Sequence, residues 1–247
     1  MADHLLAADL ATRAGQLLLG VREEFADAEA AERKAAGDRR SHEFLMAELA
    51  AARPDDAVLS EEATEAELAN SKRIGAQRVW IVDPLDGTRE FAELGRDDWA
   101  VHVALWQAGE LIAGAVALPA QGITLATPDV PAPAAGDGPA RVVVSRTRPP
   151  AVALAVRDAL DGVLVEMGSA GAKVAAVVQG HADVYVHAGG QYEWDSAAPV
   201  AVARAAGLHT SRIDGSPLRY NRTDPRLPDL IVCRPEYAAA VLAAVSS

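Results

Sequence analysis

Residues 79–91, Val-Trp-Ile-Val-Asp-Pro-Leu-Asp-Gly-Thr-Arg-Glu-Phe, constrain the fold more than any other part of this 247-residue chain. The four apolar residues at its start predict a buried strand. The strand leads into two carboxylates, Asp83 and Asp86. Because Pro84 has no N–H to give to a sheet, we expect the strand to stop there and turn.

The groups that follow this strand suit phosphoryl chemistry. Gly87 permits a tight turn, and Thr88 is expected to open a short helix. Two carboxylates and the Leu85 carbonyl are oxygen ligands of the kind that Mg²⁺ prefers, while N–H groups at a helix start bind phosphate. Asp-Pro and Asp-Gly pairs are also ordinary turn signals, so a purely structural corner is the alternative.

Two further segments place acidic residues at the ends of predicted elements. Val58-Leu59-Ser60 is predicted to be a short strand, and it ends in Glu61 and Glu62. Downstream, Asp195 lies in Tyr-Glu-Trp-Asp-Ser-Ala-Ala-Pro and is expected to start a helix, where the helix dipole favours a negative charge.

Taken together and in this order, the three segments resemble the motifs of the inositol monophosphatase superfamily, the lithium-sensitive, Mg²⁺-dependent phosphatases. The resemblance extends from near the N-terminus to about Asn221. Arg89-Glu90-Phe91 is similar to the CysQ type, the 3′-phosphoadenosine-5′-phosphate phosphatases, which usually have Lys in place of Arg89.

The pattern of predicted helices and strands in the rest of the chain indicates an α+β arrangement in the first half and an α/β arrangement in the second. A polar, Pro- and Gly-rich stretch, residues 128–139, is the clearest linker, and it separates an N-terminal α+β half (1–130) from a C-terminal α/β half (140–247). The first half is expected to carry most metal ligands, and the second to carry the Trp-Asp motif and substrate contacts. The resemblance implies a layered α–β–α–β–α sandwich.

Several residues have both a structural and a functional interpretation. Asp3 is a candidate N-cap for a first helix that ends near residue 25. Asp38 follows a polar stretch, residues 26–37, and is expected to cap the second helix. His102 alternates with valines on a strand, which favours a paired structural histidine over a ligand. Ser169, among glycines before a helix, indicates a phosphate cradle or simple close packing.

The resemblance also implies which residues act. Two or three Mg²⁺ ions would be held by Glu61, Asp83, the Leu85 carbonyl, Asp86 and Asp195. Catalysis would use Glu61 and Thr88 to orient water, with Asp38 orienting Thr88. The substrate contacts would be Asp86, Gly87, Thr88, Ser169, Lys173 and Asp195.

The expected reaction is hydrolysis of the 3′-phosphate of 3′-phosphoadenosine 5′-phosphate to AMP, as in sulfur assimilation, with the sulfated form as an open further substrate. A broader inositol monophosphatase or fructose-1,6-bisphosphatase activity is the enzymatic alternative. A non-catalytic metal or nucleotide sensor is the remote alternative. Inhibition by lithium is expected in either enzymatic case.

Composition bounds the partners and the location. The net charge of −12 argues against nucleic-acid binding, which requires cationic side chains against phosphates. The single cysteine, Cys233, forms no internal disulfide, and no apolar run approaches the roughly 20 residues that span a membrane. No secretory signal is visible, so we expect a cytoplasmic enzyme with a small-molecule substrate; whether it forms a homodimer is left open.

Overall fold

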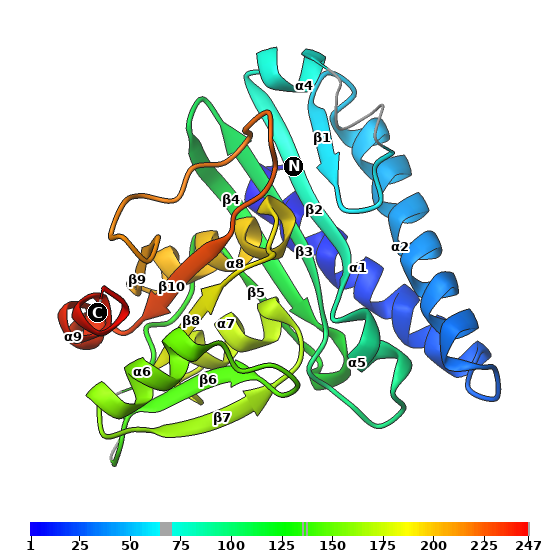
Figure 1. The fold of residues 1–247 in the computed structure, drawn as a ribbon. Helices are drawn as coiled ribbons and strands as arrows, with labels where there is room; N and C mark the ends of the chain where they lie inside the picture. Colours follow the sequence, from blue (N-terminus) through cyan, green and yellow to red (C-terminus); the bar gives the residue numbers. More distant parts are fainter. Residues whose placement is uncertain (65–70, 135, 137, 247) are drawn as a thin grey trace.

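The structure is a computed structural model, and it describes residues 1–64, 71–134, 136 and 138–246 (Figure 1). The elements of the first half are α1 (Asp3–Glu24), α2 (Ala30–Ala52), β1 (Ala57–Ser60), α4 (Ser71–Gly75), β2 (Arg78–Asp86), α5 (Thr88–Ala92), β3 (Ala100–Gln107), β4 (Glu110–Leu118), the 3-10 helix η1 (Pro119–Gln121) and β5 (Ile123–Ala126). The elements of the second half are β6 (Arg141–Ser145), α6 (Ala151–Ala159), β7 (Val163–Met167), α7 (Ala170–Val178), β8 (Val184–Ala188), α8 (Glu193–Ala205), β9 (His209–Ser211), β10 (Asp229–Cys233), the 3-10 helix η2 (Pro235–Tyr237) and α9 (Ala238–Val245). None of the helices described has the length and apolar character needed to cross a membrane.

Two five-stranded sheets form the framework of the molecule. The first has the order β1-β2-β3-β4-β5, in which β1 is parallel to β2 and the other neighbours are antiparallel. The second has the order β7-β6-β8-β10-β9, in which β6 is parallel to β7 and β8 while β10 is antiparallel to its neighbours. Because β1 and β2 are parallel, the residues that follow them lie at the same sheet edge.

Three layers of helices cover and separate the sheets. α1 and α2 pack on one face of the first sheet, where Leu10 and Trp80 share a hydrophobic cluster. α7 and α8 lie between the sheets, with Val202 in the central core. α6 and α9 cover the outer face of the second sheet through Val156 and Val241. The expected α–β–α–β–α sandwich is therefore confirmed (Figure 1).

The predicted linker connects the two sheets. Its described residues, 128–134, 136 and 138–139, form no helix or strand. Strands β1 to β5 precede it and strands β6 to β10 follow it, so each half of the chain builds one sheet. The central core contains residues of both halves, such as Leu59 and Val143. The division into two domains stays a prediction.

Asp3 is the first residue of α1 and does not cap it. The residue before the helix is Ala2, which offers no side-chain cap. The Asp3 carboxylate instead pairs with Arg53 at 2.8 Å and with Arg78 at 3.1 Å. The N-cap prediction is therefore wrong, because this carboxylate joins α1 to the end of α2 and to the start of β2.

The second helix begins at Ala30, well before Asp38. The prediction of a polar connection over residues 26–37, with Asp38 as the helix cap, is therefore wrong. Residues 30–36, Ala-Ala-Glu-Arg-Lys-Ala-Ala, are strong helix formers. Arg33 is buried within this turn of helix. Its guanidinium donates hydrogen bonds to the carbonyls of Phe25, Ala26 and Ala28, at 2.8–3.0 Å, and so closes the connection between α1 and α2.

Candidate active site

β2 does not stop at Asp83 but continues through Pro84 to Asp86. The pairing of β2 with β3 shifts register between Asp83 and Asp86. Because a bulge leaves part of the ladder unpaired, it accommodates a proline that has no N–H. The predicted end of the strand at Pro84 is therefore wrong, but a local turn exists there, since the Asp83 carboxylate accepts the Leu85 N–H at 3.0 Å.

Gly87 makes the sharp turn that leads from β2 into α5. Its φ is +82°, a left-handed conformation that favours glycine. A Cβ at this position would lie 2.7 Å from the Cβ of Ser169, so the second half of the chain approaches the turn closely. α5 begins at Thr88 as predicted.

Carboxylates from three separate segments meet beside this turn. Oxygens of Asp83, Asp86 and Asp195 lie within 4.8 Å of one another. Glu61 joins them because the parallel register pairs Ser60 with Val82, which places the next residue of β1 beside Asp83. The carboxyl groups of Glu61 and Asp83 are hydrogen-bonded. Asp195 comes from the first turn of α8.

The negative charges in this cluster repel one another, and the repulsion contributes to raised pKa values of Glu61, Asp83 and Asp195. Burial, with the neighbouring carboxylates, raises the pKa of Asp83 well above its usual value. Burial and the negative charge of Asp86 raise the pKa of both Glu61 and Asp195 to about 7. A group of oxygen ligands in this condition suits a hard cation, because a bound cation turns the repulsion into attraction. The cluster could therefore hold a metal ion.

The pKa of Asp86 is lowered, unlike that of the neighbouring carboxylates, because hydrogen-bond donors surround its carboxylate. Its carboxylate accepts from the Ser169 hydroxyl (2.5 Å) and from the N–H groups of Ala170 (3.2 Å) and Gly171 (2.5 Å). Burial would raise its pKa, but His102 and these donors lower it to about 2. The sequence predicted that the start of α7 is either a phosphate cradle or a site of close packing. In the structure, the N–H groups of Ala170 and Gly171 there donate to Asp86.

His102 is a buried, paired histidine, as expected. It lies opposite Asp83 in the β2–β3 ladder, its Nδ1 is 3.0 Å from the Trp194 carbonyl, and its Nε2 is 3.2 Å from Asp86. Burial opposes its charge, but Asp86 raises the pKa of the imidazole above its usual value. The sequence pattern placed His102 on a strand, but it did not reveal this link to Asp86.

Asp38 and Thr88 approach the cluster from α2 and α5. Gly37 lets α2 come close, since a Cβ there would lie 2.7 Å from the Phe91 ring. Burial, with the negative charge of Glu62, raises the pKa of Asp38 to about 6. The Thr88 hydroxyl donates to the Leu85 carbonyl at 3.3 Å. Among the described residues no hydrogen bond joins Asp38 to Thr88, and their catalytic roles stay predictions.

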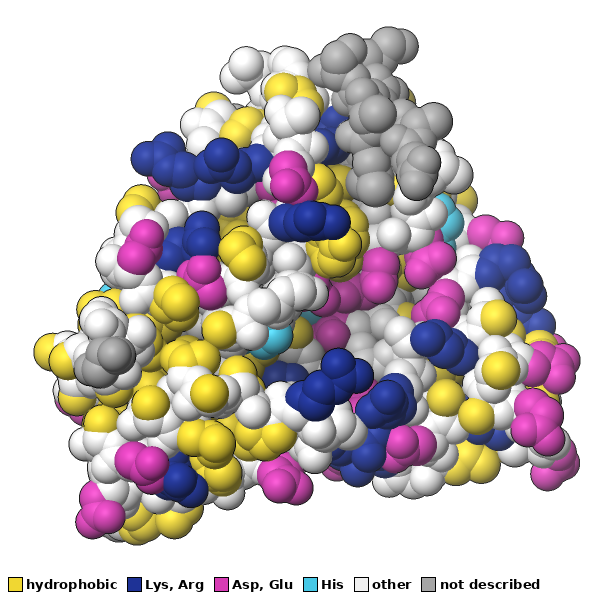
Figure 2. All heavy atoms as spheres, viewed as in Figure 1, with side chains coloured by type: hydrophobic (Ala, Val, Ile, Leu, Met, Phe, Trp, Pro, Cys, Tyr) yellow, Lys and Arg dark blue, Asp and Glu magenta, His cyan; other side chains and the backbone are white. Residues whose placement is uncertain are grey.

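A cavity of about 670 Å³ opens beside the carboxylates. Asp86, Thr88 and Asp195 are among its lining residues. The other lining residues include basic or imidazole side chains, namely Arg89, Arg146, Arg148, Lys173 and His187. Figure 2 shows acidic side chains in the hollow and basic ones along its lower edge. Arg146, Arg148 and His187 were not among the residues expected at the site. The Ser-Arg-Thr-Arg run directly after a predicted strand is a signal for the two arginines, and no such signal marks His187.

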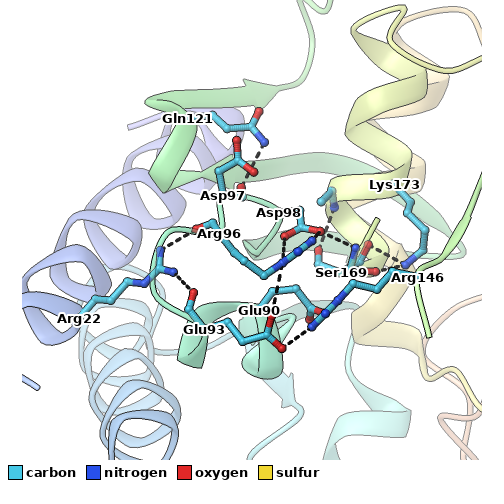
Figure 3. Close-up of polar contacts among 12 residues, drawn as sticks. Arg22, Glu90, Glu93, Arg96, Asp97, Asp98, Gln121, Arg146, Ser169 and Lys173 are labelled. Atoms are coloured by element: carbon cyan, nitrogen blue, oxygen red, sulfur yellow. Dashed lines mark hydrogen bonds and ion pairs between the residues drawn. The ribbon is translucent and has the colours of Figure 1, made fainter. Parts of the chain in front are cut away.

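A network of ion pairs fixes one wall of this cavity (Figure 3). The guanidinium of Arg146 pairs with Glu90 at 2.8 Å and with Glu93 at 2.6 Å. Asp98, which pairs with Arg96, accepts the Gly168 N–H at 2.6 Å. The network therefore ties α5 and the residues after it to the loop that starts α7.

Lys173 lies one turn into α7, and its side chain is 5% exposed. The ammonium donates to the Ser169 carbonyl at 2.9 Å and also to the Gly168 carbonyl (Figure 3). Burial lowers the pKa of this lysine. Lys173 thus holds the loop before α7 and also borders the cavity; its contact with a substrate stays a prediction.

α8 begins at Glu193, before the expected first residue Asp195. The Asp195 carboxylate accepts the Tyr192 N–H at 2.6 Å, so it caps the helix as well as joining the cluster. Glu193 is fully buried and accepts the N–H groups of Asn221 (2.6 Å) and Arg222 (2.8 Å). The loop before β10 therefore holds the start of α8 in place.

Comparisons with known proteins agree with this geometry. The family model described as "Inositol monophosphatase family" matches residues 3–130 and 140–247. A 3'-phosphoadenosine 5'-phosphate phosphatase of Mycobacterium bovis is 52% identical over 242 residues, 94% of this chain and 89% of that protein. The 3'(2'),5'-bisphosphate nucleotidase CysQ of Escherichia coli K12 is 33% identical and covers 75% of this chain and 78% of its own length. The crystal structure of CysQ from Bacteroides thetaiotaomicron has a TM-score of 0.77 at 28% identity and covers 94% of this chain and 97% of that one. The chain belongs to the inositol monophosphatase family.

Proposed function

We propose that this protein is a Mg²⁺-dependent phosphatase that hydrolyses the 3′-phosphate of 3′-phosphoadenosine 5′-phosphate, releasing AMP and inorganic phosphate. One observation carries the proposal: the carboxylates of Asp83, Asp86 and Asp195 lie together, and two of them, Asp86 and Asp195, line a cavity that basic side chains also line. The names of relatives at 49–52% identity support the same substrate. The sulfated nucleotide is a further substrate to test.

The donor set fits Mg²⁺, because every candidate ligand is an oxygen. We propose that Glu61, Asp83, Asp86, Asp195 and the Leu85 carbonyl hold two or three ions. Bound Mg²⁺ would lower the pKa of water and neutralise the phosphoryl oxygens. Glu61, beside Asp83 at the end of β1, would accept the proton of the water.

The remaining groups orient the reactants. Thr88 stands at the start of α5, where its hydroxyl would orient the water together with Glu61. The N–H groups of Gly87 and Thr88 would bind the phosphoryl group. Asp38 acts from α2, close to this corner. Ser169 and Lys173 act through the loop before α7, since their polar atoms contact Asp86 and the Gly168 and Ser169 carbonyls.

The shape and charge of the cavity favour a substrate with two phosphate groups. A volume of about 670 Å³ lies in the range of pockets that hold a nucleotide-sized ligand. Arg89 and Arg148 border the cavity, and neither forms an ion pair with a described residue. One phosphate would lie at the carboxylates with their cations and the other near these arginines. Inositol 1-phosphate has a single phosphate and would leave the arginines unmatched.

The test is phosphate release by the purified protein with Mg²⁺ and each of three substrates. We expect kcat/KM to be highest for 3′-phosphoadenosine 5′-phosphate and lower for fructose 1,6-bisphosphate and inositol 1-phosphate. Equal efficiency on all three would favour the broad-specificity alternative. Release from none of them, with binding retained, would favour the sensor.

The variant Arg148→Gln, measured in the same assay, tests whether Arg148 contributes to nucleotide selection. It should raise KM for the adenosine bisphosphate by about tenfold or more, the effect of losing a charge-assisted contact, and leave inositol 1-phosphate nearly unchanged. Arg157→Gln is the matched control, because Arg157 lies on α6 and pairs only with the adjacent Asp158 among described residues. Equal effects of Arg148→Gln on both substrates would remove Arg148 from nucleotide selection.

A further inference from the structure

A second basic cavity lies outside the active site, in the segment between β9 and β10. Its volume is about 460 Å³. Its lining residues are Arg212, Ser216, Pro217, Arg219, Arg222, Asp224, Arg226 and Leu227. None of them lines the cavity beside the carboxylate cluster. Figure 1 shows this segment as the orange loop that leads into β10.

The positive charge in this cavity is largely unbalanced. Arg212 is paired with Asp229. Within the described part of the chain, Arg219, Arg222 and Arg226 have no carboxylate at ion-pair distance, and all three are exposed. Asp224 supplies the one carboxylate that lines the cavity. Such a concentration of guanidinium groups is notable in a protein with a net charge of −12, since long-range attraction would favour pairing with its many carboxylates.

The backbone that presents these arginines is held by hydrogen bonds. The Arg212 N–H donates to the Ser216 carbonyl at 2.9 Å, and the Arg226 N–H donates to the Asp224 carboxylate at 3.1 Å. The Leu227 N–H donates to the Gln191 carbonyl at 2.9 Å. The arginines therefore project from a fixed loop, and less ordering is needed when they bind a ligand together.

We propose that this cavity is a second anion site, which takes the phosphate or sulfate group of a small molecule. A guanidinium presents parallel N–H groups that match two oxygens of a tetrahedral oxyanion. Arg219, Arg222 and Arg226, which line the cavity, supply these donors. The volume admits a free oxyanion or a phosphorylated nucleoside. The overall negative charge opposes a nucleic-acid chain at this surface.

The site is linked to the active site through backbone contacts. Arg222 lines the cavity with its side chain, while its N–H donates to the Glu193 carboxylate. The Glu193 N–H in turn donates to the Pro225 carbonyl at 2.8 Å. Glu193 opens α8, which carries Asp195. An anion on these arginines should therefore steady the segment that positions Asp195.

The test measures binding to the full-length protein in EDTA, where the carboxylate cluster repels anions. Isothermal titration with sodium sulfate, sodium phosphate and AMP, at ionic strength matched with NaCl, gives a Kd for each probe. We expect Arg219→Gln/Arg222→Gln to weaken binding by about tenfold or more, and Arg157→Gln to bind as the wild type. Binding of the inorganic ions identifies a free oxyanion site; binding of AMP alone identifies a nucleotide phosphate.

Hydrogen exchange locates the ligand independently of activity. The bound probe should slow exchange at amides in residues 219–227, with little change at residues 168–173 of the active site. Equal affinity of the double variant and the wild type, slowing confined to residues 168–173, or no binding of any probe would each overturn the proposal. Arg219 and Arg222 are exposed, and the variant keeps the Arg222 N–H bond, so unchanged thermal unfolding of the variant serves as the check on folding.

Discussion

Asp195→Asn tests the carboxylate cluster through stability. The pKa of Asp195 rises from 3.8 to about 7 through burial and the negative charges of Asp86 and Glu61. A rise of that size costs the folded protein roughly 2–4 kcal/mol when the carboxyl is ionised and no cation is bound. Asparagine removes this charge. Its side-chain oxygen still accepts the Tyr192 N–H, so the helix cap is kept.

The size of the effect depends on pH. A carboxyl with a raised pKa in the folded state costs nothing below the unfolded value near 4, because both states are then protonated. The cost grows as pH rises and is complete above about pH 7. In EDTA at pH 8, Asp195→Asn should therefore raise the unfolding temperature by roughly 5–10 °C. At pH 4 the two proteins should unfold at nearly the same temperature.

Mg²⁺ should reduce or remove the difference between the two proteins. A cation that binds only the folded state adds about 2.7 kcal/mol at a hundredfold excess over its Kd. The wild type should therefore gain several degrees with Mg²⁺ and lose them with EDTA, while Asp195→Asn should gain much less. Differential scanning calorimetry at pH 4 and pH 8 measures both effects. If the variant is less stable in EDTA at pH 8 and keeps the full Mg²⁺ shift, Asp195 is only a helix cap and the proposed metal site is wrong.

Four further expectations follow from the same geometry. Glu61→Gln and Thr88→Ala should each lower kcat by at least about a hundredfold with a smaller change in KM, and near-normal turnover of Glu61→Gln would exclude it as the proton acceptor. Lys173→Ala should raise KM for the adenosine bisphosphate more than for inositol 1-phosphate; because its ammonium also holds two carbonyls, calorimetry should show lost stability as well, and equal KM changes would assign it to the loop alone. Gly87→Ala should destabilise the fold by about 1–3 kcal/mol in urea unfolding, since φ is +82° and the new Cβ would meet Ser169, whereas Gly109→Ala, with φ +104° but no atom within 4 Å of its Cβ, isolates the backbone strain. LiCl should inhibit phosphate release more than equal NaCl, because Li⁺ is close to Mg²⁺ in size but carries a single charge; identical responses would contradict the metal assignment.

Local patterns predicted much of the fold. The apolar run before Asp83 is a central strand, and α5 begins at Thr88 as expected. These features depend on nearest neighbours along the chain, where periodicity and turn residues are informative. The layered sandwich and the meeting of Asp83, Asp86 and Asp195 came from the resemblance to a family. Periodicity by itself did not bring three distant segments together.

Sequence patterns did not predict which side chains of distant segments contact one another. The pairing of Arg146 with Glu90 joins residues 56 positions apart, and polarity alone does not say which arginine meets which carboxylate. Asp38 has good N-cap chemistry, but the helix-forming residues before it extend α2 back to Ala30. Pro84 by itself predicts the end of a strand, and no local sequence pattern reveals the register shift that accommodates it.

The bonds between Asp86 and the start of α7 set the order in which activity can appear during folding. They connect residues 83 to 85 positions apart, from β2 in the first sheet to the start of α7 in the second half of the chain. Closing so long a loop is slow, so contacts of this kind form late. A chain that has folded only its first sheet holds Asp83, Asp86 and His102, but it lacks Asp195 and the donors at the start of α7. We therefore expect folding intermediates to be inactive toward phosphate esters, and activity to appear only with the final docking of the two sheets.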